Sequence, residues 1–277
     1  MTTTRWLTGL ALSSLLAACG GSSPAGNTAT GTTFTYGAPQ AATAEQAGAL
    51  EVAVSSLDAF RASPGAAAGL GVADATGVAG RLLQGGAIGS FSPSSLGASA
   101  LSVFDAPACA AVAAGRVTFT GCTVTISPSS TNGRASGTVT VGGFVALAAD
   151  GQTLDWDLTY GVQLTMAGTV PTTLNGTLHS SGQVVATATT ATGSAASEAS
   201  LTASIAGQTM SAALDESLTF DVTRSASCAA GVTGGTLEVK RVWITRPAAV
   251  PAAELPDAAA RVTWTGCGTA SVQLGTR

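Results

Sequence analysis

The chain carries little charge of either sign, and basic residues are especially few. Asp, Glu, Lys and Arg make up 9% of the 277 residues, with 11 basic against 15 acidic side chains. Lys240 is the single lysine, and the arginines are scattered rather than clustered. A nucleic-acid-binding surface needs a basic stripe that neutralises phosphates, so we expect no nucleic-acid partner.

Histidine and the common catalytic motifs are also scarce. His179 is the single histidine, so a histidine-based metal site is excluded and a Ser-His-Asp triad would have to use this residue. It lies beside Ser180 and Ser181 at a predicted turn, where an exposed imidazole without a chemical role is the favoured interpretation. The chain has no Gly-x-Ser-x-Gly elbow, phosphate-binding loop or dinucleotide fingerprint. We therefore predict neither enzyme activity nor a cofactor.

Long hydrophobic runs are absent from the sequence as well. No segment reaches the ~20 apolar residues that a membrane-spanning helix needs. The most apolar run, from Trp6 to Leu16, follows Arg5 and is 11 residues long. A run of this length after a positive residue is typical of the core of a secretory signal peptide. It leads into the small residues Ala17 and Ala18, followed by Cys19.

The motif Leu16-Ala17-Ala18-Cys19 resembles the lipobox of bacterial lipoproteins. The resemblance implies that residues 1–18 are a signal peptide and that Cys19 is acylated, for example with palmitate, at the mature amino terminus. Two or three acyl chains, each buried CH₂ contributing ~0.8 kcal/mol, would anchor the chain in a lipid bilayer. Gly20 follows where an Asp would favour the inner membrane in enterobacterial lipoproteins, so the resemblance implies the outer membrane. The alternative is an ordinary secretory leader with an incidental cysteine.

Besides Cys19, the chain has four cysteines, an even number in a chain predicted to be exported: Cys109, Cys122, Cys228 and Cys267. This pattern favours two disulfide bonds, although spacing alone leaves three pairings open. Zinc is the competing use, but no Cys-x-x-Cys pair or accompanying histidine supports it.

An internal repeat bears on the pairing. The sequence Arg-Val-Thr-Phe-Thr-Gly-Cys at 116–122 recurs as Arg-Val-Thr-Trp-Thr-Gly-Cys at 261–267, and each copy lies downstream of a Cys-Ala-Ala. We expect the cysteines of the two copies to pair in the same way, each with the Cys-Ala-Ala cysteine upstream of it, which gives Cys109–Cys122 and Cys228–Cys267. The glycine before each second cysteine is a candidate β-bulge.

Two segments precede the predicted β domain. Residues 19–40 are rich in Gly, Ser, Thr and Ala, which predicts a flexible tether. Residues 41–104 are predicted to hold one helix and an Ala/Gly-rich segment. Thr43-Ala44-Glu45-Gln46 reads as a capping box. Large apolar residues then recur at helical spacing: Leu50, Val54, Leu57 and Phe60. We predict an amphipathic helix over 44–61 that packs on a sheet.

From about residue 105 to residue 277 the hydrophobic period is two, which predicts a β domain. The clearest run is 154–166, where large apolar residues alternate with Asp, Thr and Gln. Asp150-Gly151 before it is a strong hairpin signal. Further turns are predicted at Asn132-Gly133, Gly182-Gln183 and Gly207-Gln208. Other strands are predicted near 116–126, 138–147, 172–179, 184–191, 198–205, 209–214, 217–224, 236–245, 261–267 and 269–274.

Because no helix-length connection separates these runs, the sheet should be antiparallel. The predicted fold is mainly β: a twisted antiparallel sheet or partly closed barrel of about nine to eleven strands, with the amphipathic helix packed on it. The two predicted disulfide bonds would cross-link this sheet.

Two groups of side chains are the remaining candidates for chemistry. Asp155 and Asp157 share a strand face, where they could bind calcium or act as a glycosidase-like carboxylate pair, but a solvated outer face is favoured. Asp215-Glu216 is predicted to be a turn. The strand tryptophans are interpreted as core rather than as the lining of an apolar ligand cavity: Trp156, Trp243 and Trp264.

As a whole the chain resembles bacterial surface and periplasmic lipoproteins, with a lipobox, a low-complexity tether and a Thr/Gly-rich β domain. The resemblance implies acylation at Cys19 and assigns no catalytic residue. The leading hypothesis is a membrane-anchored, non-enzymatic structural or binding module, with the bilayer and an envelope protein as partners. One alternative is a carrier of a lipid or other apolar ligand, and the second is a hydrolase that uses Asp155 and Asp157.

Overall fold

The fold is taken from a computed structural model of the chain. The structure describes residues 28–47, 110–113, 115–126, 135–166, 172–205, 207–228, 231–248 and 256–277. Several predicted features lie outside these residues: the signal peptide, Cys19, Cys109, the Asn132-Gly133 turn, the Ala/Gly-rich segment and most of the 44–61 helix.

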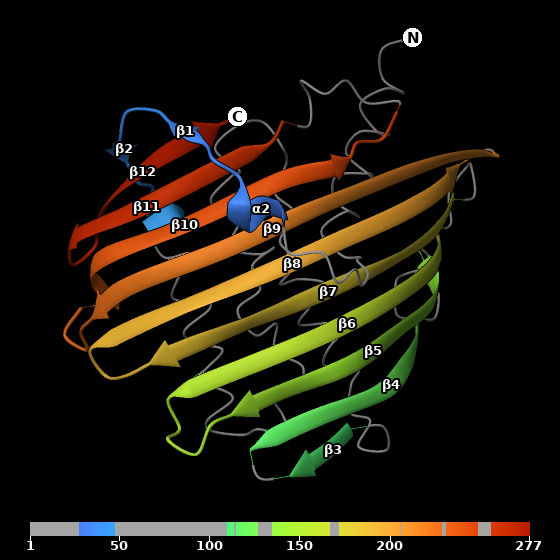
Figure 1. The fold of residues 1–277 in the computed structure, drawn as a ribbon, viewed down its shortest axis with the longest axis horizontal. Coiled ribbons are helices and arrows are strands. Elements are labelled where there is room, and N and C mark those ends of the chain that lie inside the picture. The colour runs from blue at the N-terminus through green and yellow to red at the C-terminus, as the bar shows by residue number, and fades with distance from the viewer. Residues whose placement is uncertain are drawn as a thin grey trace.

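The described strands form one twelve-stranded antiparallel sheet (Figure 1). Its strands in chain order are β1 (Thr35–Tyr36), β2 (Gln40–Ala41), β3 (Ala110–Ala113), β4 (Arg116–Ile126), β5 (Ala135–Leu147), β6 (Thr153–Met166), β7 (Thr172–Ala186), β8 (Thr190–Ile205), β9 (Gln208–Arg224), β10 (Val232–Thr245), β11 (Ala258–Gly266) and β12 (Thr269–Thr276). From β3 to β12 each strand pairs with the next one along the chain, and β1 and β2 both pair with β12. The mainly-β antiparallel prediction is confirmed, and the sheet is open rather than closed.

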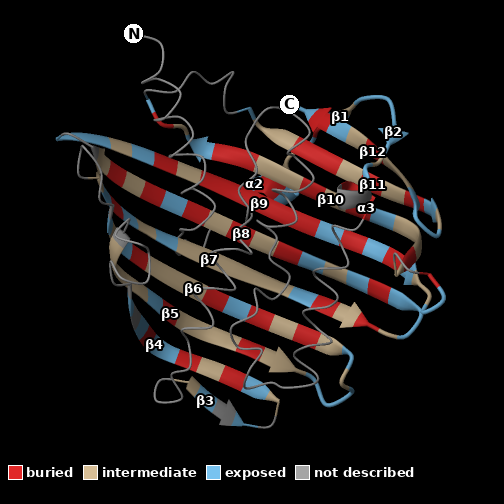
Figure 2. Cartoon of the chain, turned by 180° about the vertical axis from the view of Figure 1, so that it is seen from behind, coloured by how far each residue is buried: buried red, intermediate tan, exposed pale blue. Residues whose placement is uncertain are grey.

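The two faces of the sheet differ in polarity because side chains alternate along each strand. In β6, Leu154, Trp156 and Leu158 are buried on one face, which we call the apolar face. Asp155 and Asp157 lie on the opposite, polar face. The bands of alternating burial along the strands in Figure 2 show this period. The predicted alternation of apolar and polar side chains along the strands is therefore confirmed.

Aromatic rings on the apolar face cover glycines of the neighbouring strands. A Cβ atom added at Gly182 would overlap the indole ring of Trp156, and one at Gly193 would lie 2.7 Å from the Phe220 ring. These glycines leave room for bulky rings in the sheet rather than allowing a turn. The predicted turn at Gly182-Gln183 is therefore wrong, because both residues lie inside the continuous strand β7.

The second turn that the structure contradicts is the one predicted at Asp215-Glu216. Asp215 and Glu216 lie in the middle of strand β9, so the runs predicted at 209–214 and 217–224 are one strand. Both carboxylates have partners that make a strand position possible. Asp215, on the polar face, accepts a hydrogen bond from the backbone N–H of Thr28 at 2.8 Å. Glu216, on the apolar face, pairs with Arg241 of β10.

The hairpin between β5 and β6 turns at Asp150-Gly151, as predicted. Gly151 has a φ of 66°, a left-handed conformation that glycine adopts at little cost. The carboxylate of Asp150 accepts hydrogen bonds from the backbone N–H groups of Gln152 at 2.8 Å and Thr153 at 3.1 Å. Gly207, with a φ of 80°, lies between β8 and β9 and confirms another predicted turn.

The repeated sequence folds in the same way in β4 and β11. A register shift interrupts pairing between Phe119 and Cys122 in β4, and another between Trp264 and Gly266 in β11, so the predicted bulges are confirmed. After its bulge, Cys122 is buried on the apolar face. Cys122 is disulfide-bonded, and its predicted partner lies outside the described residues.

The second predicted disulfide joins two turns at one end of the sheet. Cys228 lies between β9 and β10, and Cys267 lies between β11 and β12. Their sulfur atoms are 2.13 Å apart and their Cα atoms 5.5 Å apart. Cys228 and Cys267 are therefore the pair that the repeat predicts.

The segment before the sheet wraps around the β12 edge. Helix α2 (Thr28–Gly31) packs on the polar face, with Ala29 and Phe34 buried against Val242 and Ala259. The chain then pairs with β12 through β1 and β2 and reaches α3 (Ala44–Ala47). The predicted tether of 19–40 is therefore too long, because residues from Thr28 onward are already docked.

Helix α3 lies against the apolar face. Its capping box is formed as predicted, because the backbone N–H of Thr43 donates to Gln46 Oε1 at 2.9 Å and the N–H of Gln46 donates to Thr43 Oγ1 at 3.2 Å. Trp264 Nε1 donates to the carbonyl oxygen of Ala47 at 3.2 Å. The first turn of the predicted amphipathic helix thus packs on the sheet, as expected.

Candidate functional site

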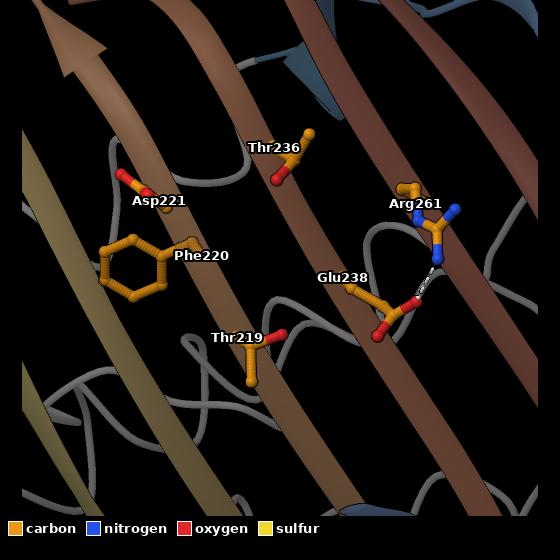
Figure 3. A pocket seen from close by; sticks show the side chains of 6 residues that line it. All are labelled: Thr219, Phe220, Asp221, Thr236, Glu238 and Arg261. Atoms are coloured by element: carbon orange, nitrogen blue, oxygen red, sulfur yellow. Dashed lines mark hydrogen bonds and ion pairs between the residues drawn. The ribbon is translucent and has the colours of Figure 1, made fainter. Parts of the chain in front are cut away.

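An open groove lies on the polar face over β9, β10 and β11 (Figure 3). It has a volume of about 440 Å³. Its lining consists of Thr219, Phe220, Asp221, Thr236, Glu238 and Arg261. Cross-strand register explains why these positions meet: Glu238 is the direct partner of Thr219 on one side and of Arg261 on the other. Phe220 alternates with its neighbours, so its ring lies on the apolar face.

Glu238 is at the centre of a fixed set of contacts. Its Oε1 accepts hydrogen bonds from the Tyr36 hydroxyl and from Arg261 Nη2, each at 2.7 Å. Lys240 Nζ lies 3.5 Å from its Oε2. The guanidinium of Arg261 also stacks 4.2 Å above the Tyr36 ring. Tyr36 comes from the short strand β1, so docking of the amino-terminal segment completes the site.

These contacts shift two pKa values in opposite directions. Burial raises the pKa of Glu238, but the hydrogen bonds from Tyr36 and Arg261 and the charges of Lys240 and Arg261 outweigh it, so the pKa is held below its usual range. Burial, together with the hydrogen bond to Glu238, raises the pKa of the Tyr36 hydroxyl. At neutral pH the pair is therefore a carboxylate anion and a protonated phenol.

The groove is suited to recognition rather than to proton transfer. A general acid or base works best with a pKa near the operating pH, whereas the Glu238 pKa lies below it. Arg261 keeps 40% of its side-chain surface exposed, so part of its guanidinium is open to a ligand. Exposed Thr219, Asp221 and Thr236 add hydroxyl and carboxylate groups beside it. The groove can thus form hydrogen bonds and ion pairs with a polar partner.

The predicted carboxylate pair lies elsewhere on the polar face. Asp155 accepts a hydrogen bond from Gln183 at 2.7 Å, and Asp157 lies 3.0 Å from His179 Nε2. The side chain of Asp157 is 52% exposed, and neither carboxylate lines the groove. The two aspartates share one strand face as predicted, and the solvated interpretation fits their partners.

The prediction for His179 is wrong. It lies inside β7, opposite Thr159 of β6 and Glu198 of β8, rather than at a turn. Its side chain is 25% exposed and is held by Asp157. The three strand tryptophans, by contrast, are buried core residues as predicted: Trp156, Trp243 and Trp264.

A row of polar residues, buried at Ser197 and Glu216, crosses the apolar face and was missed by sequence reasoning. It consists of Ser180, Ser197, Glu216 and Arg241, which are direct cross-strand partners in β7, β8, β9 and β10. Trp156 Nε1 donates to Ser180 Oγ at 3.2 Å. The row separates two apolar clusters, one around Leu218 and the other around Leu214. The sequence does contain a signal for this row: the alternation Leu214-x-Glu216-x-Leu218 places Glu216 on the apolar face.

Within the described ranges, no group of three or more His, Cys, Asp or Glu side chains is placed to hold a metal ion. None of the helices in the described part of the chain is long and apolar enough to cross a membrane. The chain matches no protein-family model, and comparisons with curated proteins and with solved structures also give no match.

Proposed function

We propose that this chain is a lipid-anchored protein of the bacterial envelope, and that its sheet is a non-enzymatic binding module. The main support for the lipid anchor is the motif Leu16-Ala17-Ala18-Cys19 at the end of a signal-peptide-like run. The disulfide between Cys228 and Cys267 supports an oxidising compartment outside the cytoplasm. Gly20 favours the outer membrane over the inner one.

The groove around Glu238 is the proposed contact surface of the module. Its carboxylate, guanidinium and hydroxyl groups favour a polar partner, such as an envelope protein, over an apolar ligand. Tyr36 and Arg261 already hold Glu238 in place, which reduces the ordering cost of binding. Recognition, rather than turnover of a substrate, is the function that this arrangement supports best.

The anchor is tested in cells that express the full chain. A signal-peptidase II inhibitor should cause the unprocessed precursor to accumulate, and Cys19→Ser should release the chain from the membrane fraction. Ser22→Ala, a change close to the processing position, is the matched control and should leave both processing and location unchanged. Normal maturation in the presence of the inhibitor would contradict the proposal.

The contact surface is tested by photo-cross-linking in the same cells. A photoreactive side chain at Thr236, in the groove, should give a discrete adduct, and Arg261→Ala in the same chain should abolish it. The control is the same probe at Thr177, which is exposed on the polar face in β7. Equal adducts at both positions, or none at Thr236, would contradict binding at the groove.

A further inference from the structure

The chain enters the folded body from the polar face. The backbone N–H of Thr28 donates to Asp215 on that face at 2.8 Å. Ala29 is fully buried against Val242 and Ala259. Figure 1 shows α2 lying over β9 and β10. Any anchor that precedes Thr28 is therefore attached to this face of the sheet.

The distance between the proposed anchor and this attachment is short. Cys19 and Thr28 are separated by nine residue steps, which span no more than about 32 Å even when fully extended. Strand β9 alone has 17 residues, a length of roughly 55 Å. The acylated end therefore keeps α2 within about 32 Å of the bilayer, a distance shorter than the length of β9.

A surface patch beside this attachment suits a bilayer, and we define it as Ile244, Arg246, Asp257 and Arg277. Ile244 is 51% exposed, and it lies two residues beyond Val242, the residue that packs against Ala29 of α2. Arg246 and Arg277 both pair with Asp257, at 2.6 Å and 3.1 Å. The two arginine side chains keep 31% and 59% of their surface exposed, so part of each guanidinium remains open to a further anion.

We infer that the Ile244 patch rests on the surface of the bilayer that holds the acyl chains, and that it takes anionic lipid headgroups. The exposed isoleucine enters the boundary between headgroups and acyl chains, while the arginines pair with lipid phosphates. The end of β10 beside α2 then faces the membrane, and the groove around Glu238 lies six positions back along that strand, about 20 Å from Ile244. This inference rests on the proposed acylation of Cys19, because the short tether is what brings the patch to the membrane.

The test uses the full lipidated chain in phosphatidylcholine vesicles that contain phosphatidylglycerol. Ile244→Trp adds an exposed indole to a chain whose other strand tryptophans are buried. Bromine atoms on the lipid acyl chains should quench the added fluorescence at least about twofold, since the indole lies at the membrane boundary. Gln163→Trp, at an exposed position on the polar face in β6, is the control and should be unaffected.

Mass spectrometry of the same sample distinguishes a failure of this inference from a failure of the proposed lipid anchor. If the acyl chains are present and Ile244→Trp is not quenched more than Gln163→Trp, the inference is overturned while the proposed anchor stands. If no acyl chain is present, the proposed function itself fails.

A second measurement needs no substitution. Amide hydrogen exchange of the lipidated wild-type chain should be several-fold slower at residues 244–248 in vesicles than in detergent. Residues 153–166 of β6 should exchange equally in both. Equal exchange at 244–248 in vesicles and detergent would overturn the inference.

Discussion

Glu216 is the residue whose environment differs most from what its chemistry prefers. It is 1% exposed on the apolar face, between Leu214 and Leu218, and its carboxylate pairs with Arg241. A buried ion pair adds little net stability, because the loss of hydration offsets the attraction. Removing one member is costly, since it leaves a buried charge without its counter-ion. The pair therefore favours the register that aligns β9 with β10.

The first prediction concerns this ion pair. Arg241→Met should lower the free energy of unfolding by about 3–5 kcal/mol, because the charge of Glu216 loses its partner. Adding Glu216→Leu to that variant should recover most of the loss. Urea denaturation measures both effects. The control is Lys240→Met, a neighbouring change on the polar face, which should cost at most about 1 kcal/mol. Equal losses for the single and double variants would contradict this account.

The second prediction compares two strand glycines. Gly182→Ala should destabilise the sheet by about 1–3 kcal/mol, because the added methyl group collides with the Trp156 ring and with the backbone of β8. Gly142→Ala adds the same group where no atom lies within 4 Å, so it should be neutral or slightly stabilising. Thermal unfolding of both variants measures the difference. A Gly182→Ala protein as stable as Gly142→Ala would show that the ring does not need this space.

At the scale of elements, the sequence predicts features whose causes are local. The Asp150-Gly151 turn, the capping box at Thr43 and the two bulges depend on neighbouring residues alone. Glycine and acidic residues at 182 and 215–216 predict turns by the same local rules. Those predictions fail because the deciding contacts come from other elements of the fold: the ring of Trp156, the backbone of Thr28 and the side chain of Arg241.

The groove could not be predicted from the sequence for the same reason. Tyr36 and Glu238 are 202 positions apart, and only docking of the amino-terminal segment against β12 brings them together. The period of two correctly places Glu238 and Arg261 on the polar face. It does not reveal which polar positions of different strands become neighbours.

The third prediction concerns the pH dependence of the contact between Tyr36 and Glu238. The lowered pKa of Glu238 means that its contribution to stability is present above its usual pKa of 4.5 and is lost as the pH falls through the lower folded value. The raised pKa of Tyr36 means that its contribution is present below its usual pKa of 10.0 and is lost as the pH rises above that value.

Tyr36→Phe should therefore cost about 1 kcal/mol at neutral pH and weaken both pH dependences. The phenyl ring keeps its stacking on Arg261, so the change isolates the hydroxyl. Urea midpoints at acidic, neutral and alkaline pH measure the effect. A Tyr36→Phe protein with an unchanged pH profile would show that the hydrogen bond does not contribute to stability.

The fourth prediction concerns the disulfide between the two turns. Its cysteines are 39 positions apart, and in the loop-entropy model closing a loop of this length contributes about 4 kcal/mol. Cys228→Ser together with Cys267→Ser should lower the urea midpoint accordingly. The matched control is Ser225→Ala with Thr269→Ala, which changes residues close to the same two cysteines and leaves the disulfide in place. An unchanged midpoint in the cysteine variant would contradict a stabilising role.

At the scale of the whole molecule, the sheet is built from pairs of strands that follow one another in the chain. The amino-terminal segment is the exception, since it starts on the polar face at α2, passes the β12 edge and ends at α3 on the apolar face. It therefore connects the proposed anchor, the Glu238 groove and the core. A change that detached this segment would disturb all three.

The central claim, a chain held at a membrane by an acylated cysteine, is tested most directly by intact mass spectrometry of the mature protein from the envelope. Our account predicts an amino terminus at Cys19 that carries the mass of two or three acyl chains, with the Cys228–Cys267 disulfide oxidised. A mature chain that begins at another residue, or that has the mass of the bare polypeptide, would contradict it.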